Sequence, residues 1–236
     1  MQGEAVGRVV ALWRYPVKSM AGEALSEAQV SWHGIAGDRR WAFVRDGTAR
    51  NGFPWLSIRE RAEMCHYHPF FVDPAKPDKS ATQVRAPDGR EFDVADPALA
   101  AELHPEGARL IKLDRGCFDS FPLSLITTSS IARIGEWVGA TLDPRRFRPN
   151  LLVETTDGAP FQEDAWLGRV LRIGEISLRI DKRDGRCVIT TIDPDTLERN
   201  PEVLRTIARE REGKLGVYAS TVERGRVAVG DNVYLV

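Results

Sequence analysis

The sequence predicts a mostly β protein with some α-helix, organised as a β-barrel and a smaller β-rich domain. Short runs rich in Val, Ile, Thr and aromatic residues recur along the whole chain. Turns that contain Gly, Pro or Asp separate these runs, and only a few segments have the spacing of an amphipathic helix. Many short strands with regular turns are typical of barrels and related β folds.

The N-terminal part is expected to open with a small antiparallel sheet. Strands are predicted over 6–15, 25–32 and 39–45, because their apolar and β-branched residues suit a pleated surface. A polar loop at 17–23 and a glycine-punctuated turn at 33–38 separate them. Residues 51–59 are expected to be irregular, 64–72 to form another short strand, and 73–80 to form a surface loop.

A hairpin and a short helix follow in the predicted order. Residues 84–86 and 91–94 flank Pro87-Asp88-Gly89, which has the residue types of a tight turn. Asp96 can cap a helix that begins at Pro97 and ends near Gly107. After a strand over 110–113 comes a polar stretch, where we place the boundary between domains 1–115 and 116–236.

The C-terminal part is predicted to alternate strands with two helices. Residues 122–127 form a buried strand, and Thr128, Ser129 or Ser130 caps a helix that closes at Gly139. A strand over 151–153 and a hairpin of 170–173 with 176–180 come next. Asn200-Pro201 begins the second helix, which stops at Gly213. Closing strands are expected over 216–222, 227–229 and 233–236.

The clearest candidate for chemistry is Cys187. It begins the β-branched run 188–192, which predicts a buried strand that Asp193-Pro194-Asp195 ends. A thiolate is a nucleophile and a metal ligand, and a nearby cation such as Arg186 favours it. Adjacent strand residues point to opposite faces, however, and most unpaired cysteines are buried structural residues. We interpret Asp193 and Asp195 as turn residues, with a supporting role for Asp193 at the site as the alternative.

Composition excludes several classes of protein. The 33 basic and 34 acidic residues nearly cancel, so the chain has no net positive charge that would attract nucleic acid or a membrane surface. No apolar run is long enough to span a bilayer, and the N-terminus lacks the features of a signal peptide. Three widely separated cysteines argue for reduced thiols in a cytoplasmic protein and against an iron–sulfur cluster. Cys117 is expected in an exposed loop, and Cys65-His66-x-His68 lacks the second ligand pair of a structural zinc site.

Five motifs occur in one order along the chain. They are Tyr15-Pro16-Val17-Lys18-Ser19, Gly37-Asp38-Arg39-Arg40-Trp41, Arg146-Phe147-Arg148-Pro149-Asn150, Arg186-Cys187 through Asp193-Pro194-Asp195-Thr196, and Gly230-Asp231-x-Val233. Together they resemble the MOSC family (molybdenum cofactor sulfurase C-terminal domain), preceded by its N-terminal β-barrel-like companion. The resemblance covers essentially the whole chain. It implies a MOSC barrel, similar to the small barrel of pyruvate kinase, over 116–236.

The resemblance also implies a ligand, the molybdenum cofactor (Mo-molybdopterin) and not pyridoxal phosphate. In the amidoxime-reducing members the cysteine that matches Cys187 ligates the metal, which makes Cys187 the expected catalytic residue and metal ligand. The residues expected around the pterin and phosphate are Lys18, Ser19, Arg39, Thr127, Thr128, Ser129, Arg148, Asn150 and Arg186. A soft thiolate suits molybdenum, and cations with hydroxyl donors suit a phosphate. The alternative interpretation is that these arginines are solvated or paired surface charges, which applies to Arg39, Arg146 and Arg148.

The leading functional hypothesis is an oxidoreductase that reduces N-hydroxylated or N-oxide small molecules. The alternatives are a carrier that holds sulfur as a persulfide on Cys187, and a non-catalytic molybdenum cofactor carrier. The sequence shows neither the membrane anchor nor the ferredoxin domain of some members. We therefore expect electrons from a separate reductase or ferredoxin-type protein, and neither nucleic acid nor a membrane as a partner.

Overall fold

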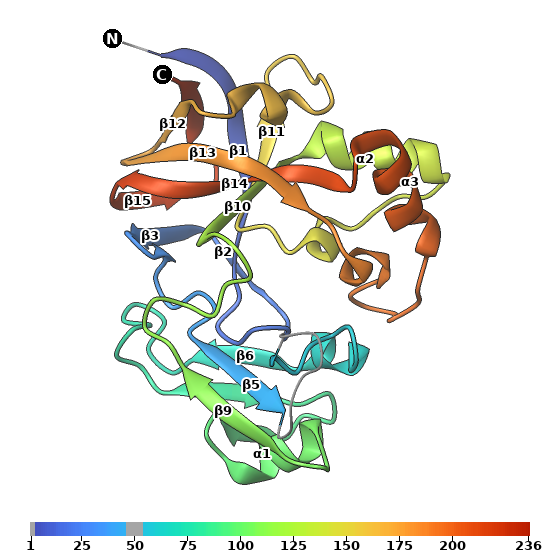
Figure 1. Cartoon of the computed structure of the whole chain (residues 1–236). Helices are drawn as coiled ribbons and strands as arrows, with labels where there is room; N and C mark the ends of the chain where they lie inside the picture. Colours follow the sequence, from blue (N-terminus) through green and yellow to red (C-terminus); the bar gives the residue numbers. More distant parts are fainter. Residues whose placement is uncertain (1–2, 46–53) are drawn as a thin grey trace.

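The computed structural model describes residues 3–45 and 54–236. Met1, Gln2 and residues 51–53 of the stretch expected to be irregular lie outside the described residues. Figure 1 shows two parts, one above the other. The upper part, here called the barrel part, holds both chain ends, and the lower one, the smaller part, is built from a continuous middle segment of the chain.

The barrel part contains most of the regular structure. Its strands are β1 (Glu4–Arg14), β2 (Glu23–Leu25), β3 (Glu27–Ser31), β4 (Gly34–Ile35), β10 (Leu123–Thr127), β11 (Leu151–Thr155), β12 (Val170–Ile173), β13 (Ile176–Gly185), β14 (Lys214–Glu223), β15 (Gly225–Ala228) and β16 (Asn232–Leu235). Its helices are α2 (Thr128–Val138) and α3 (Pro201–Arg211), with 3-10 helices at Pro144–Phe147, Gln162–Trp166 and Val188–Thr191.

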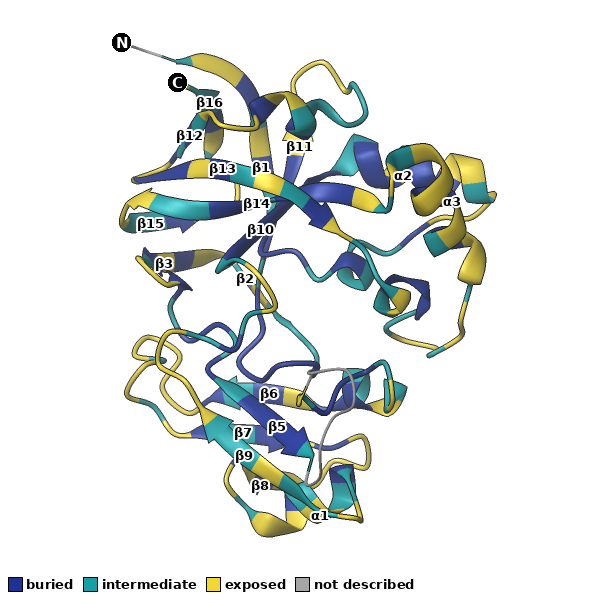
Figure 2. Ribbon diagram, viewed as in Figure 1, coloured by how far each residue is buried: buried dark blue, intermediate teal, exposed yellow. Residues whose placement is uncertain are grey.

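Seven strands close into a barrel, which confirms the predicted mostly β fold. The hydrogen-bonded order is β1-β11-β10-β14-β13-β12-β16 and back to β1, with β2 added beside β1. Closure removes the free edges that an open sheet would present. Inward-facing aliphatic side chains fill the interior, together with the fully buried indole of Trp166. Figure 2 shows β10 buried along its length.

The expected opening sheet is wrong, because its three strands join three different sheets. β1 enters the barrel, β3 pairs with β15, and β5 (Trp41–Arg45) pairs with β9 (Ala108–Lys112) of the smaller part. The period of a strand predicts which face is buried but not which distant strand supplies the hydrogen bonds. The domain division at residue 115 stays a prediction, and two of the N-terminal strands lie against C-terminal ones.

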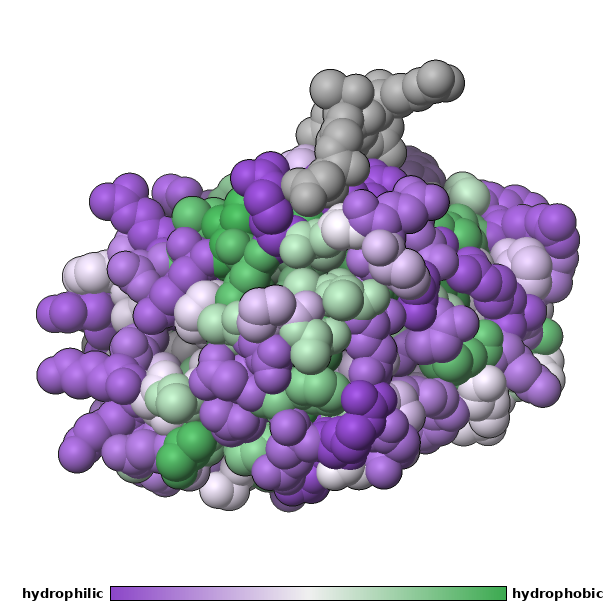
Figure 3. Space-filling view, turned by 90° about the horizontal axis from the view of Figure 1, so that it is seen from below, coloured by the Kyte–Doolittle hydropathy of each residue, from purple (hydrophilic) through white to green (hydrophobic). Residues whose placement is uncertain are grey.

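The smaller part packs two small sheets and a helix around its own core. It contains β5, β6 (His68–Phe71), β7 (Thr82–Arg85), β8 (Glu91–Asp93), β9 and α1 (Pro97–Leu103). The hairpin of β7 and β8 and the cap of α1 by Asp96 are as predicted, whereas α1 ends at Leu103, before Gly107. Residues 62–66, partly expected as strand, form a 3-10 helix. Seen from below, hydrophilic side chains ring a weakly apolar centre (Figure 3).

Both predicted helices of the barrel part are confirmed, but the expected cap of α2 at Thr128, Ser129 or Ser130 is wrong, because the cap lies one residue earlier. The Thr127 side chain caps α2 by accepting from the Ser130 amide, and Gly139 ends the helix in the left-handed region with φ 74°. Asn200 caps α3 through the Glu202 amide. The two helices pack against each other on the outside of the barrel (Figure 1).

The predicted strand over 188–192 is wrong. Residues Val188–Thr191 form a 3-10 helix for which Cys187 is the N-cap, and Val188 is exposed. The hydroxyls of Thr190 and Thr191 donate to the carbonyls of Cys187 and Val188 at 2.9 and 2.7 Å. Such local side-chain bonds compete with sheet pairing. The preceding strand β13 runs to Gly185, beyond the Ile180 predicted, and the chain turns away directly after it.

Candidate functional site

A cavity of about 510 Å³ lies between the two parts, and Cys187 lines it. The smaller part and its connecting loops contribute Lys18, Ser19 and Arg59. The barrel part contributes the end of β13, the 3-10 helix after it and the start of β10. Strand ends and loops from both parts therefore converge on one hollow, as is common for ligand sites.

The cavity concentrates positive charge, although the whole chain is nearly neutral. Nine basic and two acidic residues line it among the described part of the chain. The basic residues are Lys18, Arg39, Arg59, Arg146, Arg148, Lys182, Arg183, Arg186 and Lys214. Several of them also form ion pairs, so part of this charge is compensated. The remaining field favours an anionic ligand.

Cys187 is half-buried and contacts a cation from the other part of the molecule. The Nη2 atom of Arg59 donates to its Sγ atom at 3.4 Å. Burial lowers the pKa of Arg59, but the contact with Cys187 and the charges of Asp119 and Glu60 together outweigh this, and the net shift is upward. Arg186, the cation expected beside the thiol, instead donates to the carbonyls of Leu215 and Phe147 at 2.7 and 2.9 Å. Arg186 and Cys187 thus point in different directions although they are adjacent in sequence, as expected for extended backbone.

Lys18 and Ser19 sit on a tight loop at the cavity wall. Ser19 is buried with a positive φ of 70°, and Lys18 is buried beside it. The Lys18 Nζ atom donates to Asp119 Oδ1 at 2.6 Å and to the carbonyl of Cys117 at 3.2 Å. Burial lowers the pKa of Lys18, and the charge of Asp119 opposes this shift. The ammonium is therefore held in place by a carboxylate and a backbone carbonyl.

Arg39 and Arg148 stack on the ring of Tyr15. Their guanidinium carbons lie 4.6 and 4.2 Å from its centroid. Arg39 is paired with Asp38 at 2.5 Å and donates to the Arg148 carbonyl at 3.0 Å. Arg148 donates to the carbonyl of Met20 at 2.8 Å. Neither side chain is a solvated surface charge, and Arg39 forms an ion pair with 14% of its side chain exposed.

Asn150 is fully buried, and its side chain ties four segments together. Its Nδ2 atom donates to the Trp13 carbonyl and to Asp38, both at 3.2 Å. Its Oδ1 atom accepts from the Ser124 amide at 3.1 Å. These bonds engage both ends of the amide, so Asn150 holds the loops that carry Arg39 and Arg148.

Arg186 belongs to a buried polar cluster at the cavity wall. Its Nη1 atom is 3.1 Å from Asp184 Oδ2, and both side chains are about 5% exposed. Burial raises the pKa of Asp184, while Arg186 and a hydrogen bond from Tyr218 oppose this shift. The cluster fixes the end of β13, two residues before Cys187, so Arg186 has a positioning role.

Thr127, Thr128 and Ser129 do not line this cavity, which corrects their placement in the site. Thr127 Oγ1 donates to the buried carboxylate of Glu163 at 2.9 Å, and Ser129 donates to the Ala159 carbonyl at 2.9 Å. Thr128 lines a different hollow, between α2 and the segment that follows it. β10 does reach the cavity, but through Ser124 at its N-terminal end. Hydroxyls at the start of a helix find hydrogen-bond partners within their own segment. The sequence did not indicate which end of β10 faces the cavity.

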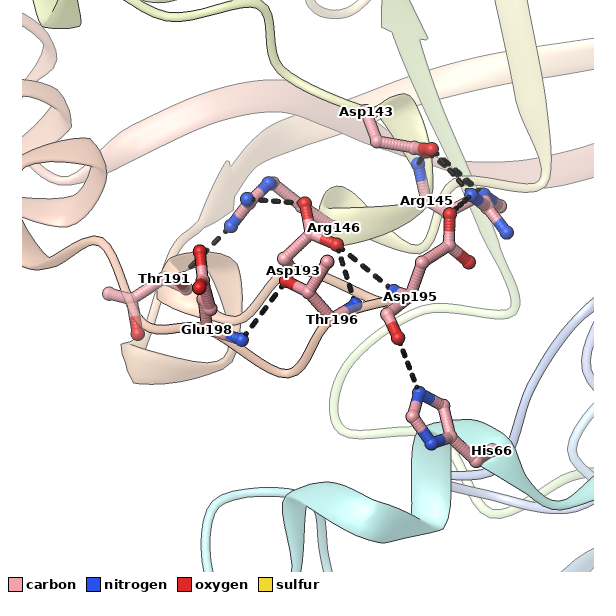
Figure 4. A network of polar contacts seen from close by, with 9 residues as sticks. All are labelled: His66, Asp143, Arg145, Arg146, Thr191, Asp193, Asp195, Thr196 and Glu198. Carbon is pink, nitrogen blue, oxygen red and sulfur yellow. Dashed lines mark hydrogen bonds and ion pairs between the residues drawn. The ribbon is translucent and has the colours of Figure 1, made fainter. Parts of the chain in front are cut away.

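A polar network fixes the loop that follows the Cys187 turn (Figure 4). Arg146 donates to Asp193 at 2.7 Å and to the Thr191 carbonyl at 3.0 Å. Asp193 accepts from the amides of Asp195 and Thr196, both at 3.0 Å. From the smaller part, a ring nitrogen of His66 lies 2.8 Å from the Asp195 carbonyl. Asp193 is thus a turn residue that also holds the loop to Arg146.

Sequence reasoning missed several lining residues. Arg59, Ser57, Asp119, Lys182 and Tyr218 all face the cavity. None belongs to one of the five motifs, and no local pattern marks them. Only the approach of distant segments in the fold brings them to Cys187.

The other cysteines lie outside this cavity. Cys117 is buried, not exposed as expected, because its amide bonds to the Arg39 carbonyl and its thiol packs inside. Cys65, His66 and His68 line a second, smaller hollow. Within residues 3–45 and 54–236, three or more His, Cys, Asp or Glu side chains nowhere gather as a metal site would require. Over the same ranges, every helix is too short or too polar to cross a bilayer.

Comparison with known proteins places both parts in one family. Residues 6–116 match the MOSC N-terminal beta barrel domain, and residues 112–234 match the MOSC domain. The chain is 25% identical to mitochondrial amidoxime-reducing component 1 from Homo sapiens, over 99% of this chain and 84% of that protein. It is 28% identical to mitochondrial amidoxime reducing component 2 from Homo sapiens, over 98% and 84%.

Two further relatives extend the comparison. The chain is 28% identical to molybdenum cofactor sulfurase from Drosophila mojavensis, over 90% of this chain, and it spans about a third (32%) of that protein. Among solved structures, the YUAD protein from Bacillus subtilis superposes with a TM-score of 0.54 at 12% identity, over 100% of this chain and 98% of that one. That likeness concerns the fold alone. With both family domains matched in order, the chain belongs to the MOSC family, with its N-terminal β-barrel domain followed by the MOSC domain.

Proposed function

We propose that this chain binds the molybdenum cofactor between its two parts and reduces N-hydroxylated or N-oxide small molecules. The observation that carries the proposal is the Cys187 thiol at the edge of a strongly basic cavity. A thiolate is the soft ligand that a dithiolene-held molybdenum accepts, and the basic wall suits a phosphate-bearing pterin. The relatives named for amidoxime reduction, at 25% and 28% identity, support the same proposal.

The residues present fit such a ligand. Cys187 would ligate the metal, while Lys18, Ser19, Arg39 and Arg148 would face the phosphate and pterin. The donor chemistry agrees, since the buried Lys18 ammonium lies at the cavity wall beside exposed Asp119. Asn150 and Arg186, whose polar atoms bond to neighbouring segments, would hold the walls in place.

The bound cofactor would supply the two-electron redox chemistry. Overall, the N–O bond of the substrate breaks, and two electrons and two protons convert its oxygen to water. The cavity would orient the substrate and exclude bulk water around the thiol. We propose a separate reductase or ferredoxin-type protein as the electron donor, because the three cysteines lack iron–sulfur spacing. Three unpaired cysteines support a reducing, cytoplasmic setting.

A second candidate function is sulfur carriage as a persulfide on Cys187. The similarity to molybdenum cofactor sulfurase and the half-exposed thiol beside Arg59 favour it. The Cys187 thiolate would attack the terminal sulfur of a persulfide on a cysteine desulfurase. The sulfur–sulfur bond of the donor breaks, its cysteine leaves as the thiolate, and Cys187 carries the sulfur.

The first test compares the wild type with Cys187→Ser, each purified from a host that makes the molybdenum cofactor. Molybdenum is measured by elemental analysis and pterin by fluorescence after oxidation. We expect stoichiometric metal and pterin in the wild type and a large loss of metal in the variant. Cys65→Ser is the matched control, because this thiol lies outside the cavity. It should keep both at wild-type levels.

The remaining outcomes separate the functions. Folded wild-type protein with neither metal nor pterin would contradict the cofactor proposal. A persulfide found by mass spectrometry on the Cys187 peptide of that protein, after incubation with a cysteine desulfurase, would then support sulfur carriage. Full cofactor content without turnover of any N-hydroxylated substrate or donor, but with transfer to an apo-enzyme, would indicate a cofactor carrier.

A further inference from the structure

A second cavity, of about 210 Å³, lies beside the first. Arg146, Arg148 and Ile189 line both cavities and so form the wall between them. The smaller part closes the second cavity from the other side with Cys65, His66 and His68, the cluster that did not fit a zinc site. The proposed function assigns no role to this space.

The walls of this cavity are largely apolar. Trp13, Ile58, Ile192 and Pro194 contribute to its lining, together with the ring of Tyr15. His66 and Asp195 both line this cavity, and the contact of the His66 ring with the Asp195 carbonyl joins the smaller part to the loop after Cys187 (Figure 4). The cavity is therefore a defined recess with fixed walls, suited to a compact ligand with an apolar body.

Three buried donors around this recess have no hydrogen-bond partner. They are the Tyr15 hydroxyl, the Nε atom of Arg146 and the Nη2 atom of Arg148, judged within residues 3–45 and 54–236. Tyr15 is 2% exposed, so water does not reach its hydroxyl from the surface. Buried donors in native proteins nearly always have partners, and each orphan calls for an explanation. Tyr15 lines only this recess, and Arg146 and Arg148 lie in the wall that it shares with the first cavity, so an acceptor placed in the recess would lie beside all three residues.

The charges around the recess leave one cation uncompensated. Arg145 pairs with Asp143 and Asp195, and Arg146 pairs with Asp193. Arg148 donates to the Met20 carbonyl and pairs with no carboxylate among the described residues, and burial lowers its pKa. Burial also raises the pKa of Tyr15 to about 12, so its hydroxyl remains a proton donor at neutral pH. One anionic group would satisfy both the charge and the donors.

We propose that this recess is a second ligand site, for a small planar monoanion of the aryl-carboxylate class. The ring would lie against Trp13, Ile58 and Ile192, and the carboxylate would accept from Tyr15, Arg146 and Arg148. A cavity of about 150 Å³ lined by apolar side chains can take up benzene. The recess, at about 210 Å³, has room for such a ring and a carboxylate.

Benzoate is the probe that tests this site, with calorimetry on the full chain as purified and with its metal and pterin content recorded. We expect one benzoate per chain, with benzamide at least about tenfold weaker because it lacks the charge. Tyr15→Phe should weaken benzoate about tenfold, since one hydrogen bond to a charged group is lost. The same variant should unfold at an unchanged or higher temperature, because its hydroxyl has no partner to lose.

Two further variants sharpen the result. Ala21→Leu adds volume at the lining of the recess and should abolish benzoate binding while leaving molybdenum and pterin content unchanged. Tyr67→Phe is the matched control. It removes a hydroxyl that donates to Glu102 at 2.6 Å, away from the recess, so it should lower stability and leave benzoate affinity unchanged.

Four results would overturn the proposal. They are no benzoate binding at millimolar concentrations, equal affinity for benzamide, wild-type affinity in both Tyr15→Phe and Ala21→Leu, and displacement of benzoate when the main cavity is loaded with cofactor. The last would show that the recess is an extension of the main cavity. None of these outcomes depends on catalytic turnover, so the failure of this proposal is distinct from failure of the proposed function.

Discussion

The carboxylate of Asp193 lies 2.7 Å from the Nη2 atom of Arg146 and joins the Cys187 turn to the segment Pro144–Phe147. Arg146 is 8% exposed, whereas Asp193 is 25% exposed. The second oxygen of Asp193 caps its own turn through two amides. One carboxylate thus fixes both the shape of the loop and its position beside the cavity.

Replacing Asp193 should destabilise the protein. Asp193→Ala leaves Arg146 buried without its anion and removes two turn hydrogen bonds, for which we expect a loss of about 2 kcal/mol in the free energy of unfolding. Asp195→Ala is the matched control, because its pair with Arg145 is exposed and should contribute less than about 1 kcal/mol. Urea unfolding measures both. Equal losses would show that burial of Arg146 does not set the difference.

The same carboxylate predicts a stability change in acid. Burial raises the pKa of Asp193, but hydrogen bonds from the Thr196 and Asp195 amides and the charge of Arg146 outweigh this and give a net lowering. Because the folded-state pKa is lowered, ionised Asp193 stabilises the protein at pH values above the ordinary carboxyl pKa of about 4. This stabilisation is lost as the pH falls below that value and through the lower pKa of the folded state. Unfolding midpoints of the wild type and Asp193→Asn should therefore converge as the pH falls through that range. A gap that persists at the lowest pH would rule out ionisation as its cause.

Asn150→Ala should destabilise the protein whether or not a ligand is bound. The change leaves the buried Ser124 amide without its acceptor and removes a donor to Asp38, so we expect a loss of about 3 kcal/mol. Chemical denaturation of protein prepared without molybdenum cofactor measures this effect. A variant as stable as the wild type, but deficient in cofactor, would instead assign Asn150 to ligand contact alone.

Lys18→Met should separate stability from ligand affinity. Burial lowers the pKa of Lys18, so folding disfavours its charged form at neutral pH, and an apolar side chain of similar length avoids that penalty. We expect stability within about 1 kcal/mol of the wild type or higher, because exposed Asp119 tolerates the loss of its partner. Cofactor content should fall.

A control and a contrary result complete that test. Lys182→Met changes an exposed lysine of the same cavity, which lies 5.2 Å from the ring of Phe121, and should reduce cofactor content less. Full cofactor content in Lys18→Met would contradict the role of this ammonium in anion binding.

Local structure could be predicted from the sequence wherever neighbours in the chain decide it. Asp96, Asn200 and Gly139 mark helix ends through contacts within a few residues, and Pro87-Asp88-Gly89 specifies its own turn. The five motifs likewise identified the family and drew attention to Lys18, Arg39, Arg148 and Cys187. Each of these signals lies within a short stretch of chain.

Tertiary structure decided everything that depends on which distant segments meet. It sent β1, β3 and β5 to three different sheets, turned the run after Cys187 into a 3-10 helix, and placed Thr127 at a helix cap outside the cavity. It also brought Arg59 to the Cys187 thiol from 128 residues away in the chain. Side-chain period and propensity set the face that each segment buries, whereas long-range packing selects the partner that covers it.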